Sequence, residues 1–239
     1  MSTIRIGSLA YMYQAIDVIG PLDVLSSGSK LVAQALKEYR PMSYELISAA
    51  PEVEYHHIGV NLDPVQLTAG FSIIPTATVD NAPEIDILLL GGPDPANFTL
   101  HPKFADYIRQ HVAAGKVLFT NCTGSFVAAL SGVLDGRKAT INNAELEWIK
   151  KRLPKVNWTV ETKWVVDGNI WTAAGAVAGM DMTTHWLKMN YGQEVLTLAT
   201  MGLDFEPRDV NGVLNVIPKR YDSAGNQITT HIFPYYDSY

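Results

Sequence analysis

Two short apolar stretches, residues 86–90 and 116–120, constrain the fold of this sequence more than any other feature. Beyond their first residue, neither stretch has a polar face. The segment between them, residues 102–114, carries apolar residues at every fourth position and stops at Gly115, which is typical of an amphipathic helix. Strands without a polar face are buried on both sides, as in a parallel sheet covered by helices. The sequence therefore predicts a parallel sheet.

The rest of the sequence continues this alternation of strands and helices. We expect further strands at residues 4–9 and 44–49, short hairpin-like strands within 58–74, and a hairpin over 158–173 that turns at Asp167-Gly168-Asn169. We expect further helices at 15–25, interrupted by a break at Gly20-Pro21, at 29–39, 126–130 and 144–153, and on both sides of 190–192. This order predicts one doubly wound α/β domain over residues 1–208, followed by an irregular tail over 209–239.

Composition and charge exclude several classes of protein. The 239 residues include 18 Lys and Arg against 24 Asp and Glu, and the basic residues are scattered, so we expect no nucleic-acid partner. No apolar run reaches the roughly 18 residues that a membrane helix needs, so we expect no membrane partner. The stretch after Met1 leads into the first strand without the regions of a secretory signal, which favours a cytoplasmic location.

The only cysteine, Cys122, lies where an apolar strand passes into a helix through the turn that contains Gly124. A side chain at such a turn is lifted above the sheet and faces the free N–H groups of the helix. We therefore expect the pKa of Cys122 to be lowered and its thiolate to be nucleophilic near neutral pH. The alternative is that Cys122 is a small buried core residue, and its position in the sequence leaves both interpretations open.

Four separated segments resemble the ThiJ/PfpI superfamily. They are residues 17–24 (Asp-Val-Ile-Gly-Pro-Leu-Asp-Val), 89–92 (Leu-Leu-Gly-Gly), 121–125 (Asn-Cys-Thr-Gly-Ser) and 174–181 (Ala-Gly-Ala-Val-Ala-Gly-Met-Asp). They stand in the family's order within residues 4–202. The resemblance implies a flavodoxin-like fold with a mostly parallel sheet, helices on both faces, and a reactive cysteine at the elbow between a strand and a helix.

The resemblance also implies roles for single residues. Cys122 matches the family's nucleophile, and Asp17 matches the acid that contacts it. Gly92 and Thr123 match the two residues whose backbone N–H groups form an oxyanion-type site. Many relatives have a histidine where this sequence has Asn142. Because an asparagine cannot act as a base near neutral pH, a mechanism that pairs cysteine with histidine is disfavoured.

The Cys-Thr-Gly-Ser elbow, together with an aspartate at position 17, is most similar to the isonitrile hydratase branch of the superfamily. This implies a homodimeric hydratase that converts an isonitrile to an N-formamide without a metal or organic cofactor. Two alternatives stay open: a glyoxalase or carbonyl-adduct hydrolase of the same superfamily, and a non-catalytic protein whose thiol senses a small molecule. Some relatives join this fold to a DNA-binding helix-turn-helix, but the sequence shows no basic C-terminal module, so a regulator is not expected.

The six histidines have no spacing typical of metal ligands, so we expect no metal site. His111 and His185 fall on expected helices among apolar neighbours and are interpreted as core or surface residues. His56 and His57 are expected in a loop.

Overall fold

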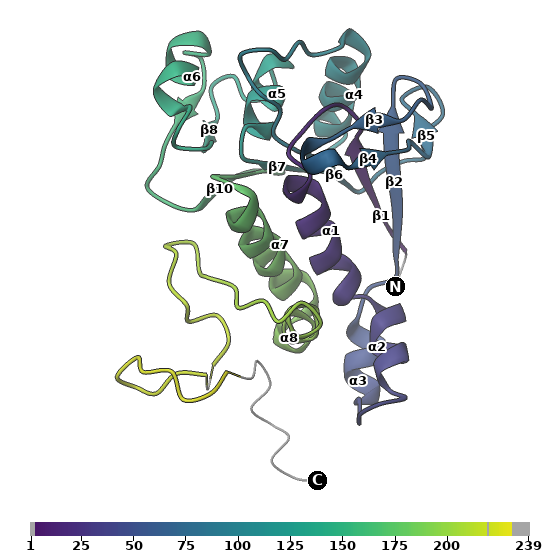
Figure 1. Cartoon of the computed structure of the whole chain (residues 1–239), viewed down its shortest axis with the longest axis vertical. Helices are drawn as coiled ribbons and strands as arrows, with labels where there is room; N and C mark the ends of the chain where they lie inside the picture. Colours follow the sequence, from purple (N-terminus) through teal and green to yellow (C-terminus); the bar gives the residue numbers. More distant parts are fainter. Residues whose placement is uncertain (1–2, 219, 231–239) are drawn as a thin grey trace. The chain divides into compact units, whose positions relative to one another are not determined.

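The computed structural model describes residues 3–218 and 220–230 of the chain (Figure 1). These residues divide into two compact units, each built from segments distant in sequence. Residues 4–20 and 54–179 form the unit that we call the sheet unit. Residue 3, residues 21–53 and the described residues from 180 onward form the unit that we call the helical unit. A single domain over residues 1–208 stays a prediction.

The sheet unit contains a seven-stranded sheet in the order β10-β11-β7-β6-β1-β2-β5. Its strands are β1 (Ile4–Leu9), β2 (Val53–Gly59), β5 (Ala77–Thr78), β6 (Ile87–Leu90), β7 (Val117–Asn121), β10 (Trp164–Asp167) and β11 (Ile170–Ala173). The pairs β1–β6, β6–β7, β7–β11 and β2–β5 are parallel, and β10 pairs with β11 antiparallel. The two apolar stretches are neighbouring strands, with Leu88 opposite Leu118. The predicted α/β class with a mostly parallel sheet is confirmed.

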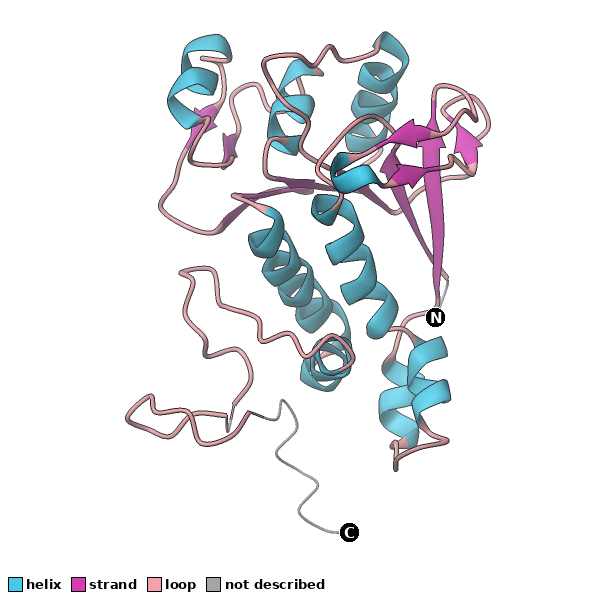
Figure 2. Ribbon diagram, viewed as in Figure 1, coloured by secondary structure: helices cyan, strands magenta, loops and turns pink. Residues whose placement is uncertain are grey.

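Two helices of the sheet unit, α4 (Pro102–Ala113) and α5 (Gly124–Leu130), pack against the central strands. A third helix, α6 (Leu146–Arg152), packs against Phe126 of α5. Figure 2 shows α4 and α5 on the same face of the sheet, where both contact β7. Gly115, with a φ of +74°, follows α4 in the left-handed region that favours glycine. His111 is buried on α4, and its Nε2 shares a 2.8 Å hydrogen bond with the carbonyl of Val117, which confirms its interpretation as a core residue.

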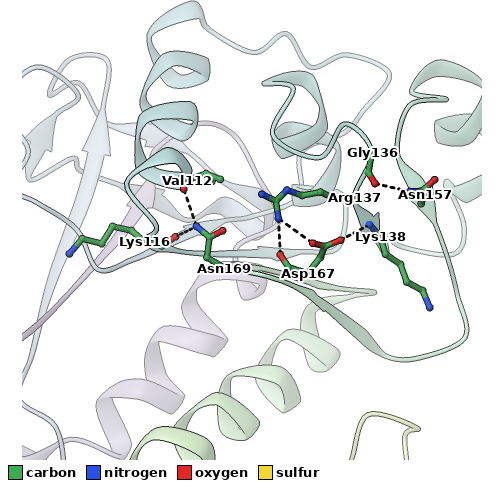
Figure 3. Close-up of polar contacts among 8 residues, drawn as sticks. All are labelled: Val112, Lys116, Gly136, Arg137, Lys138, Asn157, Asp167 and Asn169. Atoms are coloured by element: carbon green, nitrogen blue, oxygen red, sulfur yellow. Dashed lines mark hydrogen bonds and ion pairs between the residues drawn. The ribbon is translucent and has the colours of Figure 1, made fainter.

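The hairpin between β10 and β11 turns where the sequence predicts. Gly168 has a φ of +62°, and Figure 3 shows how its neighbours are held. The Asn169 side chain donates to the carbonyls of Val112 and Lys116 at 3.1 and 2.6 Å. Arg137 donates to both the carbonyl and the carboxylate of Asp167. The turn is thereby tied to the end of α4 and to the segment before α6.

Two further pairs of short strands flank the main sheet. The strands β3 (Val65–Gln66) and β4 (Ser72–Ile73) pair antiparallel, which confirms the hairpin-like strands predicted within residues 58–74. The strands β8 (Lys138–Ala139) and β9 (Asn157–Trp158) pair parallel. Trp158 was expected in the hairpin with β11, and this was wrong, because its backbone pairs with Ala139 instead.

The helical unit differs from the secondary structure expected for residues 44–49. It contains α2 (Lys30–Leu36), α3 (Tyr44–Ala49), α8 (Gln193–Met201) and most of α1 (Ile16–Ser27) and α7 (Ala176–Tyr191). Residues 44–49 were expected to form a strand but form the helix α3. The hydroxyl of Ser43 accepts a hydrogen bond from the N–H of Leu46 at 3.0 Å and so caps this helix.

The helix α1 runs without interruption through Gly20-Pro21, so the expected break is wrong. Pro21 lies inside the helix, although proline has no N–H to donate to the carbonyl four residues before it, which is that of Asp17. That carbonyl has a different partner, described with the site below.

The described end of the chain is irregular. Arg208 follows α8 and donates from its backbone N–H and its guanidinium to the buried carboxylate of Asp181 on α7. Residues 209–218 and 220–230 form turns and one isolated bridge between Tyr221 and Gln227. The remainder of the predicted tail, with His231, lies outside the described residues. No helix in the described ranges is long and apolar enough to cross a membrane.

Candidate active site

The candidate site lies at the carboxyl ends of three neighbouring parallel strands. Asp17 follows β1 at the start of α1, Gly92 follows β6, and Cys122 follows β7. Between β1 and β6 the order of the strands changes direction, because the chain places β2 on one side of β1 and all later long strands on the other. Ligands of open α/β sheets bind at such a switch point. The topology therefore gathers these three residues, which are far apart in sequence, at one edge.

The turn after β7 holds Cys122 in an unusual backbone conformation. Its φ is +55°, a region that few residues other than glycine adopt, and its N–H donates to the carbonyl of Ala173 at 3.1 Å. A Cβ on Gly124 would lie 2.2 Å from the carbonyl oxygen of Leu90, so only glycine fits there. Cys122 as a whole is 8 % exposed. Strain of this kind is concentrated at functional sites, which favours the interpretation of Cys122 as a reactive residue over a small core residue.

Asp17 is fully buried beside this turn. Its Oδ2 accepts a hydrogen bond from the N–H of Gly92 at 2.8 Å, while its Oδ1 is buried and has no hydrogen-bond partner among the described residues. Burial raises the pKa of Asp17 to about 7, and the hydrogen bond from Gly92 only partly opposes that rise. The carboxyl group can therefore gain or lose a proton near neutral pH.

The backbone of Asp17 is tied to the strand that carries the cysteine. The Asn121 side chain donates from Nδ2 to the Asp17 carbonyl, which Pro21 leaves without its usual helical donor. A Cβ on Gly179 would lie 2.3 Å from Cγ of Asn121, so glycine at this position makes room for the asparagine. Three of the four segments noted in the sequence thus meet around one side chain.

Asn142 contacts the thiol directly. Its Nδ2 donates to Sγ of Cys122 at 3.3 Å, and its Oδ1 accepts from the N–H of Ala144 at 3.0 Å. Because the second bond fixes the amide, the donor end of the side chain faces the sulfur. Asn142 therefore both shapes the turn before α6 and touches the cysteine.

The pKa of Cys122 is raised, and the expectation of a lowered pKa is wrong. Burial is the largest cause, followed by the negative charge of Asp17, while hydrogen bonds from Asn142 and from the backbone of Thr123 act in the opposite direction. The helix after the cysteine, α5, has only seven residues. Since burial and a neighbouring carboxylate outweigh the short helix and the hydrogen bonds, the resting thiol is protonated at neutral pH.

The backbone N–H groups of Gly92 and Thr123 already have partners in this state. That of Gly92 donates to Asp17, and Thr123 hydrogen-bonds the thiol. The Thr123 hydroxyl donates to the carbonyl of Pro93 at 2.6 Å and holds the loop after β6 against the cysteine turn. Their role in holding negative charge on a substrate stays a prediction.

Two histidines expected in a loop lie in a strand instead. His56 and His57 belong to β2, where His57 Nδ1 and Ser8 Oγ share a hydrogen bond of 2.8 Å. The loop prediction was wrong because residues 53–57 are half-buried or exposed and show no apolar alternation, and only the last two residues of the strand, 58–59, are fully buried.

The sequence interpretation missed Glu145. Its N–H donates to the Asn142 carbonyl at 3.2 Å, its Oε2 is buried, and its negative charge also raises the pKa of Cys122. The available signal was the spacing: a polar residue followed three positions later by glutamate is typical of a helix start, and both residues then lie in one turn.

Comparisons with known proteins agree with this fold. A family model described as the DJ-1/PfpI family matches residues 8–189. An isonitrile hydratase from Pseudomonas putida is 28% identical over 166 residues, which are 69% of this chain and 71% of that protein. The deglycase PfpI from Pyrococcus furiosus is 33% identical over 111 residues, 42% of this chain and 60% of that protein.

A transcriptional regulator and a solved structure are also similar. The HTH-type transcriptional regulator GbdR from Pseudomonas aeruginosa is 26% identical over 141 residues. The matched residues are 59% of this chain but only 38% of that protein. A crystal structure of a ThiJ/PfpI family protein from Pseudomonas syringae superimposes with a TM-score of 0.65 at 23% identity and covers 87% of this chain and 77% of that one. At this identity the structural likeness establishes the fold alone.

Proposed function

Because the chain belongs to the DJ-1/PfpI family, we propose that it is an enzyme in which Cys122 attacks a small electrophile and Asp17 transfers the proton. The proposed substrate is an isonitrile, and the product is its N-formamide. The observation that carries the proposal is the buried Asp17 carboxyl, which has one oxygen without a partner and acts electrostatically on the strained cysteine.

Asp17 has the proton affinity that a general base needs. Its pKa of about 7 lies near neutral pH, where a group is both free to accept a proton and basic enough to hold it. The thiol of Cys122 keeps its proton at rest, because burial and the Asp17 charge raise its pKa. We infer that the proton leaves sulfur for Asp17 as the sulfur attacks, which avoids two adjacent anions.

An isonitrile fits this proton transfer. Sulfur forms a bond to the terminal carbon, and the proton taken up by Asp17 passes to the same carbon, which gives a thioimidate on Cys122. Water then adds to that carbon; one of its protons goes to nitrogen and the other returns to sulfur as the carbon–sulfur bond breaks. The sum is one isonitrile plus one water giving one N-formamide, with no electron transfer.

Asn142 supports the same sequence without acting as a base. Its Nδ2 donor lies 3.3 Å from Sγ and stabilises negative charge as it develops on the sulfur. An asparagine cannot take the proton from the thiol, so Asp17 is the group that does. Similarity to isonitrile hydratase over 69% of the chain supports this choice of substrate class.

The direct test is incubation of the purified protein with neutral alkyl and aryl isonitriles and measurement of N-formamide by mass spectrometry. We expect turnover by the wild type, none by Cys122→Ala, and a loss of about 100-fold or more in Asp17→Asn, a typical effect of removing a general base. Formamide production by Cys122→Ala at the wild-type rate would refute the proposal.

A second candidate function rests on the similarity to deglycase PfpI. In this alternative Cys122 attacks the carbonyl adduct of an amine or thiol, and Asp17 again transfers the proton. Including methylglyoxal and its amine adducts in the same assay decides between the two. Turnover of the adducts but not of isonitriles would favour the deglycase-like function.

We also propose a homodimer. Ile16 and Ile19, one turn apart on α1, are both exposed, and so is Met12 just before them, which is consistent with a contact surface. Light scattering after size exclusion tests this: Ile16→Asp should shift a dimer toward the monomer.

A further inference from the structure

We propose that Glu145 sets the charge preference of the site, so that Cys122 reacts with neutral or cationic electrophiles in preference to anionic ones. This inference rests on the proposed role of Cys122 as the nucleophile, and it adds a residue that determines which substrates reach it.

The backbone of Glu145 is connected to the thiol through two consecutive hydrogen bonds. Its N–H donates to the Asn142 carbonyl at 3.2 Å, and the Asn142 side chain donates to Sγ of Cys122 at 3.3 Å. Glu145 therefore lies one turn away from the group that touches the sulfur.

The core beneath this turn holds it in place. Leu146 and Ile149 of α6 are buried together with Ile141 and with Phe126 of α5, the helix that begins at the cysteine elbow. Because the turn and the elbow share this apolar cluster, movement of Glu145 away from the site would expose apolar surface.

The Glu145 side chain has no countercharge within the part of the chain that the structure describes. Its Oε2 is buried and accepts no hydrogen bond from the described residues. Glu147, two residues further on, differs in both respects: it is 78% exposed and pairs with Lys150 at 3.2 Å. A buried carboxylate oxygen without a partner is costly, and a ligand with a positive charge or a hydrogen-bond donor would relieve that cost.

Both charged groups that act most strongly on the thiol are carboxyls. Asp17 and Glu145 each raise the pKa of Cys122, and Asp17 has the larger effect. Asp17 becomes neutral when it takes up a proton near pH 7. Glu145, by contrast, takes up no proton in the proposed reaction. An anionic electrophile that approaches the thiol would therefore be repelled by the negative charge of Glu145.

The test uses thiol reagents that differ in charge. The sequence contains one cysteine, so any thiol reagent reports on Cys122 alone. Second-order rate constants are measured at pH 8 for 2-aminoethyl methanethiosulfonate, which is cationic, and 2-sulfonatoethyl methanethiosulfonate, which is anionic, with the neutral methyl reagent as reference. In each case sulfur displaces sulfinate and forms a disulfide.

The quantity compared is the ratio of the cationic to the anionic rate constant. A change in the pKa of the thiol alters both rates equally and cancels in this ratio. We expect the ratio to fall by at least about threefold in Glu145→Gln, as expected when one charge that acts on the thiol is removed from a partly solvated site. In the matched variant Glu147→Gln it should stay within about twofold of wild type, because that charge is exposed and paired.

The possible outcomes separate this inference from the proposed function. An unchanged ratio in Glu145→Gln, with the neutral reagent still reacting, would overturn the charge preference and leave Cys122 as the nucleophile. A wild-type thiol that reacts with none of the three reagents would overturn both. As an independent arm, we expect kcat/KM to be higher for ethyl isocyanoacetate than for the isocyanoacetate anion, and Glu145→Gln should narrow that difference by a similar factor.

Discussion

The elbow at residues 121–125 and the turn at residues 142–145 both affect the sulfur of Cys122, but in different ways. Every residue of the elbow is buried, and its shape depends on backbone constraints at Cys122 and Gly124. The turn at 142–145 is partly or fully exposed and acts through the side chains of Asn142 and Glu145. The comparison indicates that the elbow fixes the reacting atom, whereas the turn adjusts how that atom behaves.

The largest expected effect is a loss of stability at the elbow. Gly124→Ala should lower the free energy of unfolding by about 3 kcal/mol or more, because the new Cβ would overlap the Leu90 carbonyl, which cannot move without breaking the sheet. Urea unfolding measures the change. Gly175→Ala is the control, since a Cβ there meets no atom within 4 Å. Equal stability of both variants would show that the elbow is less constrained than its backbone suggests.

The next effect concerns the buried carboxyl beside the elbow. The pKa of Asp17 is raised to about 7 in the folded state, above its ordinary value of 3.8, so wild-type stability should fall as the pH rises through the interval between these values and stay level above it. Asp17→Asn removes this dependence. Relative to wild type, the variant should gain roughly 2–3 kcal/mol between pH 5 and pH 8, at about 1.4 kcal/mol per pH unit.

Unfolding by urea at the two pH values measures this gain. Asp23→Asn on the same helix serves as the control, and we expect no comparable change there. A difference between Asp17→Asn and wild type that is the same at both pH values would contradict a raised pKa.

The pH dependence of activity tests the proton transfer. If Asp17 is the base, kcat/KM should rise about tenfold per pH unit below pH 7 and level off above it. This rise should persist in His57→Asn and His185→Asn. Its loss in either variant would transfer the role from Asp17 to a histidine.

The smallest expected effect lies in the exposed turn. Asn142→Ala removes the hydrogen bond to Sγ and should lower kcat/KM by about threefold to tenfold, the usual worth of one such bond. The alkylation rate of Cys122 by iodoacetamide at pH 8 should fall as well, because this bond lowers the pKa of the thiol. Asn143→Ala, at an exposed neighbour, should change neither. A 1,000-fold loss in Asn142→Ala would place this side chain among the essential groups.

The sequence predicts the elbow well and its chemistry poorly. Strands 86–90 and 116–120 are recognisable because both of their faces are apolar, and the following turn needs small residues that are visible in the sequence. The roles of Asp17, Gly92 and Asn142 come from the family resemblance. The pKa of Cys122 could not be predicted, since it depends on burial and on residues whose distance from the thiol only the fold determines.

The errors in secondary structure have a common physical cause. Residues 44–49 are too few to separate a helical from a strand-like period, and the deciding contact is the cap formed by Ser43. The break expected at Gly20-Pro21 follows from local propensity, yet α1 continues through it. In both places a single hydrogen bond or a tertiary contact outweighs the preference of the local sequence.

At Pro21 the loss of a helical hydrogen bond allows another segment of the chain to bind to the helix. Because proline cannot donate to the Asp17 carbonyl, that acceptor is open to a donor from outside the helix, and Asn121 fills it from the residue directly before the cysteine. An attempt to transplant this reactive cysteine onto another α/β scaffold would therefore have to carry the proline, the aspartate and the asparagine together. They form one transferable part, although a hundred residues of chain separate its two ends.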